Sequence, residues 1–290
     1  MATPHPAAAR LRAHVEMLAA TIGERNFWQY GALERAAQYI SAQLTAAGYT
    51  PRRQTFELAK LPLSNVETIL EGTARAGESV VVGAHYDSVA GCPGANDNAT
   101  GVAAVLELAG RFSRAPQPRT IRFVAFVNEE PPFFQTAHMG SAVYANTAKA
   151  RGERIAGMLS LETMGYYSDE PGSQRYPAPM APRYPDVGNF IGLVANMGSA
   201  RLLLRARRAF KQRTSFPMQS AAMPAAIPGV GWSDHWAFWQ AGYPAIMVTD
   251  TAPFRYPWYH TADDTPDKID YDRLAHVVDG LEAVIRSISA

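Results

Sequence analysis

The chain has 290 residues, of which 47% are hydrophobic and 18% charged, with 27 lysine and arginine side chains against 26 aspartate and glutamate side chains. This composition is typical of a folded protein with a sizeable core. The formal net charge of +1 provides no basic field that could hold nucleic acid. Because Cys92 is the single cysteine, no internal disulfide can form, and a metal would have to be held by histidine, aspartate and glutamate.

Two further features bear on where the protein resides. No apolar run approaches the ~18 residues that a membrane-spanning helix needs, so we expect no membrane span. Residues 1–14 contain arginines and histidines but no apolar core of a signal peptide. This favours a cytoplasmic protein, although a chain from which a leader had been removed would look the same. The sequence carries no signal for the oligomeric state.

The first part of the chain is predicted to contain two helices, a hairpin-like pair of strands and then an alternation of strands and helices. Helices are expected at residues 6–22 and 31–47, the second of them ending at Gly48. The paired strands follow at 54–58 and 65–71. The apolar run 80–85 predicts a buried strand. After it we expect a helix at 98–112 that is apolar on almost all faces, a strand at 120–127, a helix at 140–150 and a strand at 155–161.

Residues 166–186 interrupt this alternation. Prolines occupy five of these positions, which excludes a regular helix or a central strand. We therefore expect a long ordered excursion over a surface or a cleft. Beyond it the patterns predict a strand at 190–195, a basic helix at 202–211, a short helix at 234–240 and a strand at 244–249. The last helix has an apolar stripe from Leu274 to Ile288, and Asp270 is its expected N-cap.

The alternation of strands and helices indicates the fold class. It predicts one α/β domain over residues 1–290, with a mostly parallel central sheet covered by helices on both faces. Ligands of such sheets bind beyond the carboxyl ends of the strands. The residues that directly follow the predicted central strands are therefore the candidates for chemistry.

Two of the predicted strand ends carry unusual polar pairs. His85 ends the strand at 80–85, and Asp87 follows on the same side of an extended backbone, where a carboxylate can bind one imidazole nitrogen and leave the other for a metal. Glu129 and Glu130 follow the strand at 120–127. Two adjacent, partly buried carboxylates repel each other, and a cation between them would remove the difficulty. One of the two could bind that metal while the other faces a bound water.

Three more candidates complete the set. Asp97 precedes the apolar helix and, taken alone, would be interpreted as its N-cap. Glu162 follows the strand at 155–161, and His260, preceded by Tyr259, follows the last strand and a proline-rich loop. Together these histidines and carboxylates suit two zinc ions, or similar metals, that share a carboxylate.

Seven short motifs, in their order along the chain, resemble those of the M28 family of zinc-dependent aminopeptidases. They are GAHYDS at 83–88, GANDNATG at 94–101, FVNEE at 126–130, MGS at 139–141, LETMG at 161–165, SDH at 233–235 and YHT at 259–261. The resemblance covers roughly residues 80–285. It implies the α/β fold of zinc aminopeptidases, to which glutaminyl cyclases are related.

The resemblance also implies a role for each matching residue. His85, Asp97 and Glu162 would hold one zinc ion. Asp97, Glu130 and His260 would hold the second, so that Asp97 is shared. Glu129 would be the general base, Tyr259 would offer its hydroxyl to the tetrahedral intermediate, and Asp87 would orient His85. Many aminopeptidases of the family carry aspartate where this chain has Glu162, and the extra methylene could alter the metal geometry or the space beside the substrate's amine.

The implied function is the removal of N-terminal residues from peptide or aminoacyl substrates that have a free N-terminus. One alternative is a glutaminyl-cyclase-like aminoacyltransferase with a single zinc ion. Tyr259 before His260 disfavours it, because a cyclase is expected to carry tryptophan there. The other alternative is a catalytically inactive binding protein on the same fold. The presence of all five ligand residues and of Glu129 argues against this possibility.

Weaker candidates have ordinary structural explanations. Asp234 and His235 are as well explained by the start of a helix as by a supporting role at the site. Several aromatic residues could form an apolar specificity pocket, or could equally belong to the core or cover the sheet. These residues are Phe133, Phe134, Tyr166, Tyr167, Trp232 and Trp236.

Overall fold

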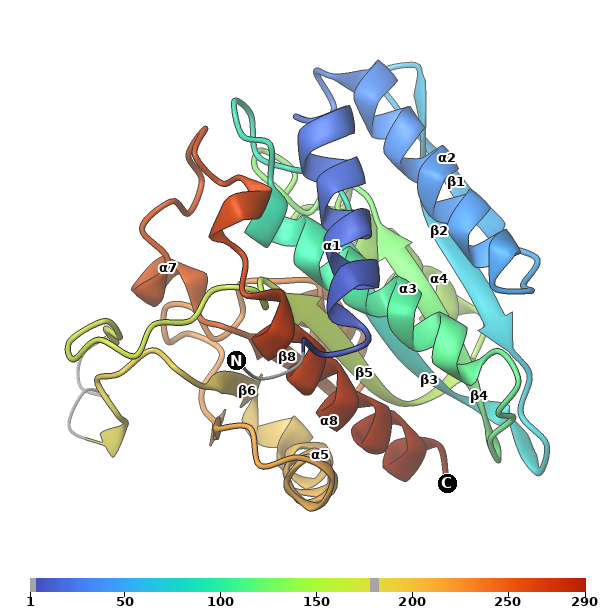
Figure 1. The fold of residues 1–290 in the computed structure, drawn as a ribbon. Coiled ribbons are helices and arrows are strands. Elements are labelled where there is room, and N and C mark those ends of the chain that lie inside the picture. Colours follow the sequence, from blue (N-terminus) through green and yellow to red (C-terminus); the bar gives the residue numbers. More distant parts are fainter. Residues whose placement is uncertain (1–3, 178–182) are drawn as a thin grey trace.

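A computed structural model describes residues 4–177 and 183–290. Its centre is an eight-stranded sheet with the order β1-β2-β4-β3-β5-β8-β6-β7 (Figure 1). The strands are β1 (Arg52–Leu58), β2 (Leu61–Leu70), β3 (Arg75–His85), β4 (Arg119–Phe126), β5 (Arg154–Glu162), β6 (Ile191–Ala195), β7 (Met218–Ala222) and β8 (Ala245–Thr249). The four central strands β4, β3, β5 and β8 are parallel, which confirms the predicted mostly parallel sheet. Only β2, β6 and β7 run in the opposite direction among the described strands.

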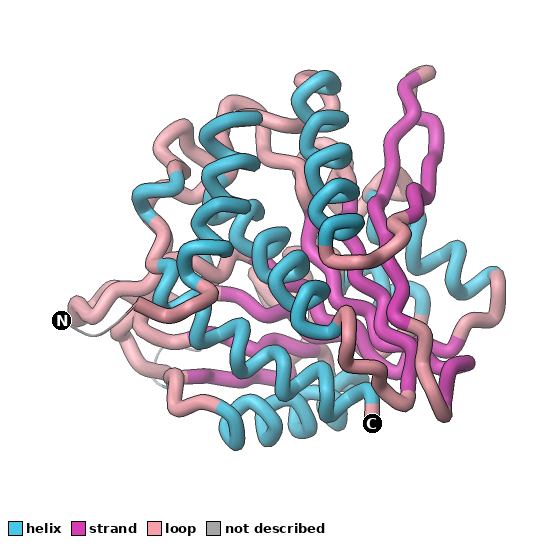
Figure 2. The backbone as a smooth tube through the Cα atoms, turned by 45° about the vertical axis from the view of Figure 1, so that its right-hand side comes forward, coloured by secondary structure: helices cyan, strands magenta, loops and turns pink. Residues whose placement is uncertain are grey.

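Helices cover both faces of the sheet, as predicted (Figure 2). The α-helices are α1 (Ala8–Val15), α2 (Tyr30–Ala46), α3 (Thr100–Phe112), α4 (Gly140–Ala150), α5 (Ala200–Arg213), α6 (His235–Ala241), α7 (Ala252–Arg255) and α8 (Tyr271–Ser289). Val80 and Val82 of β3 face the larger core, which α1, α2, α3, α5 and α8 complete. Val81 faces the smaller core on the other side, under α4 and α6. The sheet is therefore buried on both faces, as the apolar run of β3 predicts.

Short helical turns extend or precede several of these helices. They are η1 (Glu16–Ile22), η2 (Ala95–Ala99), η4 (Met197–Ser199) and η5 (Pro266–Lys268). The predicted helix at 6–22 is formed by α1 and by η1, which continues it with wider turns. The N-cap prediction for α8 is confirmed, since the Asp270 side chain accepts a hydrogen bond of 3.0 Å from the backbone N–H of Arg273.

The structure differs from the sequence predictions at several element ends and has a strand that was not predicted. β3 begins at Arg75 rather than at residue 80. β7 was not predicted at all. The helix after the first central strand starts at Thr100, and Asp97 lies before it with φ −112° and ψ 90°, so Asp97 is not the N-cap of α3. Of the excursion predicted at 166–186, residues 178–182 lie outside the described residues.

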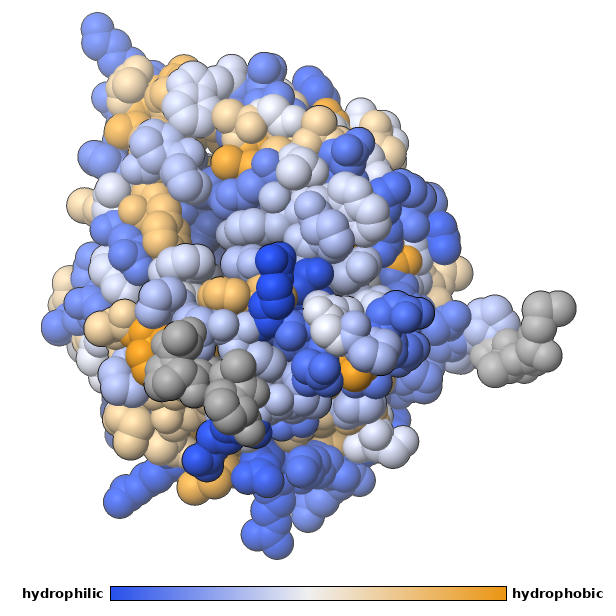
Figure 3. All heavy atoms as spheres, turned by 90° about the vertical axis from the view of Figure 1, so that its left-hand side faces the viewer, coloured by the Kyte–Doolittle hydropathy of each residue, from blue (hydrophilic) through white to orange (hydrophobic). Residues whose placement is uncertain are grey.

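None of the described helices is long and apolar enough to span a membrane. Figure 3 shows one face of the molecule, on which hydrophilic side chains dominate and apolar ones form only small patches.

Candidate metal centre

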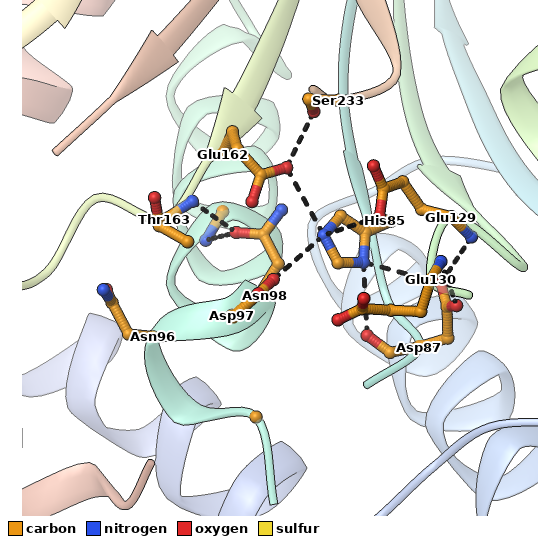
Figure 4. A network of polar contacts seen from close by, with 12 residues as sticks. His85, Asp87, Asn96, Asp97, Asn98, Glu129, Glu130, Glu162, Thr163 and Ser233 are labelled. Atoms are coloured by element: carbon orange, nitrogen blue, oxygen red, sulfur yellow. Dashed lines mark hydrogen bonds and ion pairs between the residues drawn. The ribbon is translucent and has the colours of Figure 1, made fainter. Parts of the chain in front are cut away.

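The structure brings the predicted metal ligands and Glu129 together at the carboxyl edge of the central strands. Figure 4 shows His85, Asp97, Glu129, Glu130 and Glu162 of this group. His85 is the last residue of β3, and Glu162 is the last residue of β5. Glu129 and Glu130 follow β4, and Asp97 lies in η2. His260 comes from the loop after α7. Parallel neighbouring strands end at one edge of the sheet, and for this reason residues far apart in sequence meet here.

Asp97 lies between the two histidines. Its Oδ1 atom is 3.2 Å from His85 Nε2, and its Oδ2 atom is 3.1 Å from His260 Nε2. Glu162 Oε2 is 3.4 Å from the same His85 nitrogen, and Glu130 Oε2 is 3.4 Å from the same His260 nitrogen. The result is two groups of one histidine and two carboxylates that have Asp97 in common.

Most of this constellation is buried. The exposed fraction is 0% for His85, 4% for Asp97 and Glu130, 6% for Glu129 and 8% for Glu162. His260 is the exposed member of the set. Glu129 Oε2 lies 3.8 Å from His85 Nε2. Its ligand atom also lies within 4.8 Å of a ligand atom of Glu130, so Glu129 borders both groups.

The donor set fits divalent cations of the zinc class. His85 Nε2, Asp97 Oδ1 and Glu130 Oε1 are buried without a hydrogen-bond partner. Leaving such atoms unpaired costs free energy, which a bound cation would remove. The ligand atoms of His85, Asp97 and Glu162, and likewise those of Asp97, Glu130 and His260, lie within 4.8 Å of one another. Imidazole nitrogens and carboxylate oxygens are ligands that zinc accepts.

The electrostatics of the site lead to the same conclusion. Burial raises the pKa of Glu130 to about 7, and the neighbouring charge of Asp97 adds to the effect. Burial lowers the pKa of His260, but its hydrogen bonds to Asp97 and Glu130 outweigh burial and raise the pKa to about 10. Without a cation, protons on the imidazoles would thus have to offset the carboxylates. A divalent cation would take over this role and leave the imidazoles neutral.

Comparison with known proteins identifies the family. Residues 65–285 match the model of Peptidase family M28. The chain belongs to the M28 peptidase family. It is 36% identical over 287 residues to the uncharacterized protein YfbL of Escherichia coli K12, an alignment that covers 96% of this chain and 87% of that protein. It is 28% identical over 209 residues to the aminopeptidase YwaD of Bacillus subtilis, covering 71% of this chain and 40% of that relative.

Solved structures share the fold of this M28 chain. The zinc aminopeptidase BSAP from Bacillus subtilis matches with a TM-score of 0.77 at 17% identity, over 96% of this chain and 94% of that one. A glutaminyl cyclase from Fimbriiglobus ruber matches with a TM-score of 0.71 at 19% identity, over 99% and 97% of the two chains. At these identities the similarity shows a common fold. It does not distinguish hydrolase from cyclase.

Asp87 lies against both His85 and the two glutamates that follow β4. Its backbone carbonyl oxygen, rather than its carboxylate, is nearest to His85 Nδ1, at 3.2 Å against 3.5 Å for Oδ1. The carboxylate instead accepts hydrogen bonds from the backbone N–H groups of Glu129 and Glu130, each of 3.1 Å. Asp87 thus fixes the backbone of both glutamates as well as the histidine ring.

Two supporting residues were missed or left open by the sequence analysis. Asp264 accepts hydrogen bonds from the backbone N–H groups of Asn96, at 2.7 Å, and of Asp97, at 3.1 Å, and thereby holds the shared ligand. Ser233 donates a hydrogen bond of 2.7 Å to Glu162 Oε2. The signal for Ser233 was its place in the SDH motif. Asp264 follows the YHT motif closely, but an acidic residue in a loop has no distinguishing pattern.

Asp234 and His235 are buried rather than part of an exposed helix start. Asp234 occupies the N-cap position of α6 but makes no capping hydrogen bond. Burial raises its pKa to about 7. Burial lowers the pKa of His235 to about 4, and its Nε2 atom lies 2.8 Å from the carbonyl oxygen of Val230. We therefore assign a structural role to His235.

A mostly apolar pocket with an empty volume of about 800 Å³, partly open to solvent, lies beside Glu162 and Tyr259. Leu193 of β6, Met223, Met247 and Phe254 contribute apolar lining. The described parts of the excursion contribute Tyr176, Pro177 and Tyr184, so the excursion does border a cleft.

Of the six aromatic residues proposed for a pocket, only Trp232 lines this one. Tyr167 belongs to the larger core, and Phe134 and Trp236 pack against the smaller one. Phe133 stacks on Trp28, and Tyr166 contacts Tyr256 and Trp258. Tyr167, Phe134 and Trp236 thus agree with the core interpretation, whereas Phe133 and Tyr166 pack against other aromatic side chains outside this pocket.

Proposed function

We propose that this chain is a metallo-aminopeptidase that removes the N-terminal residue from peptides with a free amine, using two zinc ions. The observation that carries the proposal is the pair of ligand groups sharing Asp97, with Glu129 beside them. His85, Asp97 and Glu162 would hold one ion, and Asp97, Glu130 and His260 the other. Membership of the M28 family supports the assignment of a peptidase.

The metal ions and the side chains around them would have separate roles in hydrolysis. When bound, the two zinc ions would supply Lewis acidity and lower the pKa of a bound water molecule. Glu129 takes the proton of the attacking water and returns it to the leaving amine. Burial raises the pKa of Glu129 well above its ordinary value, against a lowering by His85. A base that holds protons more tightly than an exposed carboxylate is suited to this transfer.

Tyr259 would stabilise the oxyanion. Its ring stacks on His260, with ring centres 3.9 Å apart, next to the pocket. Burial, together with the acids around Asp97, raises the pKa of the Tyr259 hydroxyl, which therefore stays protonated. A protonated hydroxyl can donate a hydrogen bond to the negative charge that develops on the carbonyl oxygen.

We expect a strong preference for substrates with a free amine. Glu162 is a buried acid that lines the pocket, Glu129 is a buried acid beside the same cluster, and an ammonium group would pair with them. A blocked amine would remove this charged contact from a buried site, which costs far more than the loss of an exposed contact. The kcat/KM for an unblocked aminoacyl-amide should exceed that for its N-acetyl counterpart by at least about 10²-fold. Comparable values would contradict the aminopeptidase assignment even in a protein that binds two zinc ions.

The products of the same assay distinguish an aminopeptidase from the main alternative, a glutaminyl cyclase. A glutaminyl cyclase would convert N-terminal glutamine to a cyclic product without cleaving a peptide bond. That outcome, together with one zinc ion per chain, would move the assignment to a cyclase. Turnover of peptides with other N-terminal residues would support the aminopeptidase.

The pocket predicts a preference for large apolar first residues. A leucyl substrate would fill the space between Leu193, Met223 and Phe254, whereas a glycyl substrate would leave it empty. Since one methylene in an apolar pocket changes kcat/KM about 10- to 200-fold, we expect leucyl-amide to exceed glycyl-amide by at least about tenfold. Met223→Asp should reduce this ratio, because it introduces a charge into the pocket. Met197→Asp is the control, since Met197 is 65% exposed and lies outside the pocket lining. An unchanged ratio in Met223→Asp would exclude the pocket as the subsite.

A further inference from the structure

Arg25 is a fully buried arginine close to the candidate metal centre. It lies between η1 and α2, upstream of residues 65–285, which match the family model, and its exposed fraction is 0%. In the described part of the chain its guanidinium donates only to backbone carbonyl oxygens. These oxygens belong to Tyr86, Leu18, Gly23, Pro93 and Gly94. An arginine buried this completely without a carboxylate partner calls for an explanation.

Three of the five carbonyl partners of Arg25, those of Tyr86, Pro93 and Gly94, belong to the two segments that carry candidate metal ligands, whereas Leu18 and Gly23 lie in or next to η1. Tyr86, at 2.7 Å from Nε, lies directly between His85 and Asp87. Gly94, at 2.8 Å from Nη2, precedes η2, the turn that contains Asp97. The guanidinium fork therefore ties the end of β3 to the start of η2. A planar fork with five donors is suited to fixing several carbonyl groups at once.

The backbone around Arg25 strengthens this connection. The Arg25 N–H donates to Ser88 Oγ at 3.1 Å, and the Ser88 N–H donates to the Arg25 carbonyl oxygen at 2.9 Å. Gly94 has a φ of 65°, and a Cβ atom there would collide with the backbone oxygen of Asp97. The segment around Arg25 is therefore closely packed against the segment from Gly94 to Asp97, and neither can shift without the other.

The charge of Arg25 also suits its surroundings. Burial lowers its pKa to about 10, while Asp264, Asp87, Asp97 and Glu130 act in the opposite direction. Arg25 therefore remains charged at neutral pH. The fixed positive charge of Arg25 partly compensates the negative charges of the buried carboxylates, whether or not a metal is bound.

We propose that Arg25 is a positioning residue of the metal centre, which holds the His85–Asp87 segment and the Asp97 segment at a fixed separation so that the site is formed before metal binds. The inference rests on the proposed zinc site but adds a residue that touches neither metal nor substrate. Residues that orient metal ligands typically account for a 10- to 100-fold change in metal affinity.

The test is the zinc affinity of the full chain, measured by competition with a chromogenic chelator. Arg25→Met removes both the charge and the hydrogen bonds, and Arg25→Lys keeps the charge but has only three donors. The control is Arg119→Met. Arg119 is also buried, at 7% exposed, and bonds to Glu78 and to the carbonyl oxygen of Ile288, but it begins β4 at the opposite edge of the sheet. Thermal unfolding of the metal-free proteins establishes which variants are folded.

We expect Arg25→Met to weaken zinc binding at least about tenfold and Arg25→Lys to weaken it by a smaller factor. Arg119→Met should lower the melting temperature and leave zinc affinity unchanged. If Arg25→Met does not fold, Arg25→Lys decides the question alone. Folded Arg25 variants with wild-type zinc affinity would overturn the inference. A wild-type protein that binds no zinc would instead refute the proposed function, so the two failures are distinguishable.

Discussion

Replacement of Glu129 by glutamine should lower kcat at least about 10²-fold and leave the zinc content unchanged, since general-base catalysis typically contributes 10²–10⁴-fold. Glutamine preserves the shape of the side chain and its backbone hydrogen bond to Asp87. It cannot accept a proton as a carboxylate does. The measurement is steady-state turnover of an unblocked aminoacyl-amide by zinc-loaded protein, together with metal analysis of the same sample.

Glu130→Gln is the matched control for this prediction. The neighbouring residue is equally buried, and its backbone N–H is held by the same Asp87 carboxylate at the same 3.1 Å. Its Oε2 atom, however, lies beside His260 in a ligand group. We therefore expect Glu130→Gln to lose metal affinity together with activity. Near-normal turnover by the Glu129 variant would remove that residue from the mechanism.

Asp97→Ala should be the most damaging change of a metal ligand. Its two carboxylate oxygens face different histidines, so its loss removes a ligand from both groups at once. We expect this variant to retain only traces of zinc after gel filtration, where the wild type retains close to two equivalents. Asp263→Ala changes an exposed acid in the loop of His260 and should retain both ions. Two equivalents of zinc in Asp97→Ala would refute the shared-ligand arrangement.

The metal-facing residues were predictable because their positions follow from the strand pattern. His85 and Glu162 each end an apolar run long enough to be recognised as a buried strand, and parallel strands end at one edge. The motifs then supplied the remaining members of the set. The assignment of ligand and base roles, and of one domain over residues 1–290, stays a prediction until measured.

Other parts of the structure had no comparable signal. β7 has the sequence MQSAA, lacks β-branched residues and lies half-buried at the edge of the sheet, so neither propensity nor alternation marks it. Arg25 bonds to backbone carbonyl groups, which are the same for every residue type and leave no pattern in the partner sequence. The sequence left the six aromatic residues open between a pocket and the core, because an aromatic side chain is equally favourable in both.

The metal ligands and the pocket rest largely on different strands. His85 and Glu162 end β3 and β5, whereas β6 and β7 contribute Leu193, Ser220 and their neighbours to the pocket. β6 pairs with the central strands only through β8. Under the proposed function, substitutions in β6 and β7 would therefore change which substrate side chain fits the pocket without displacing His85 and Glu162. Peptide specificity would then evolve through β6 and β7, while β3 and β5 with the candidate metal ligands stay unchanged.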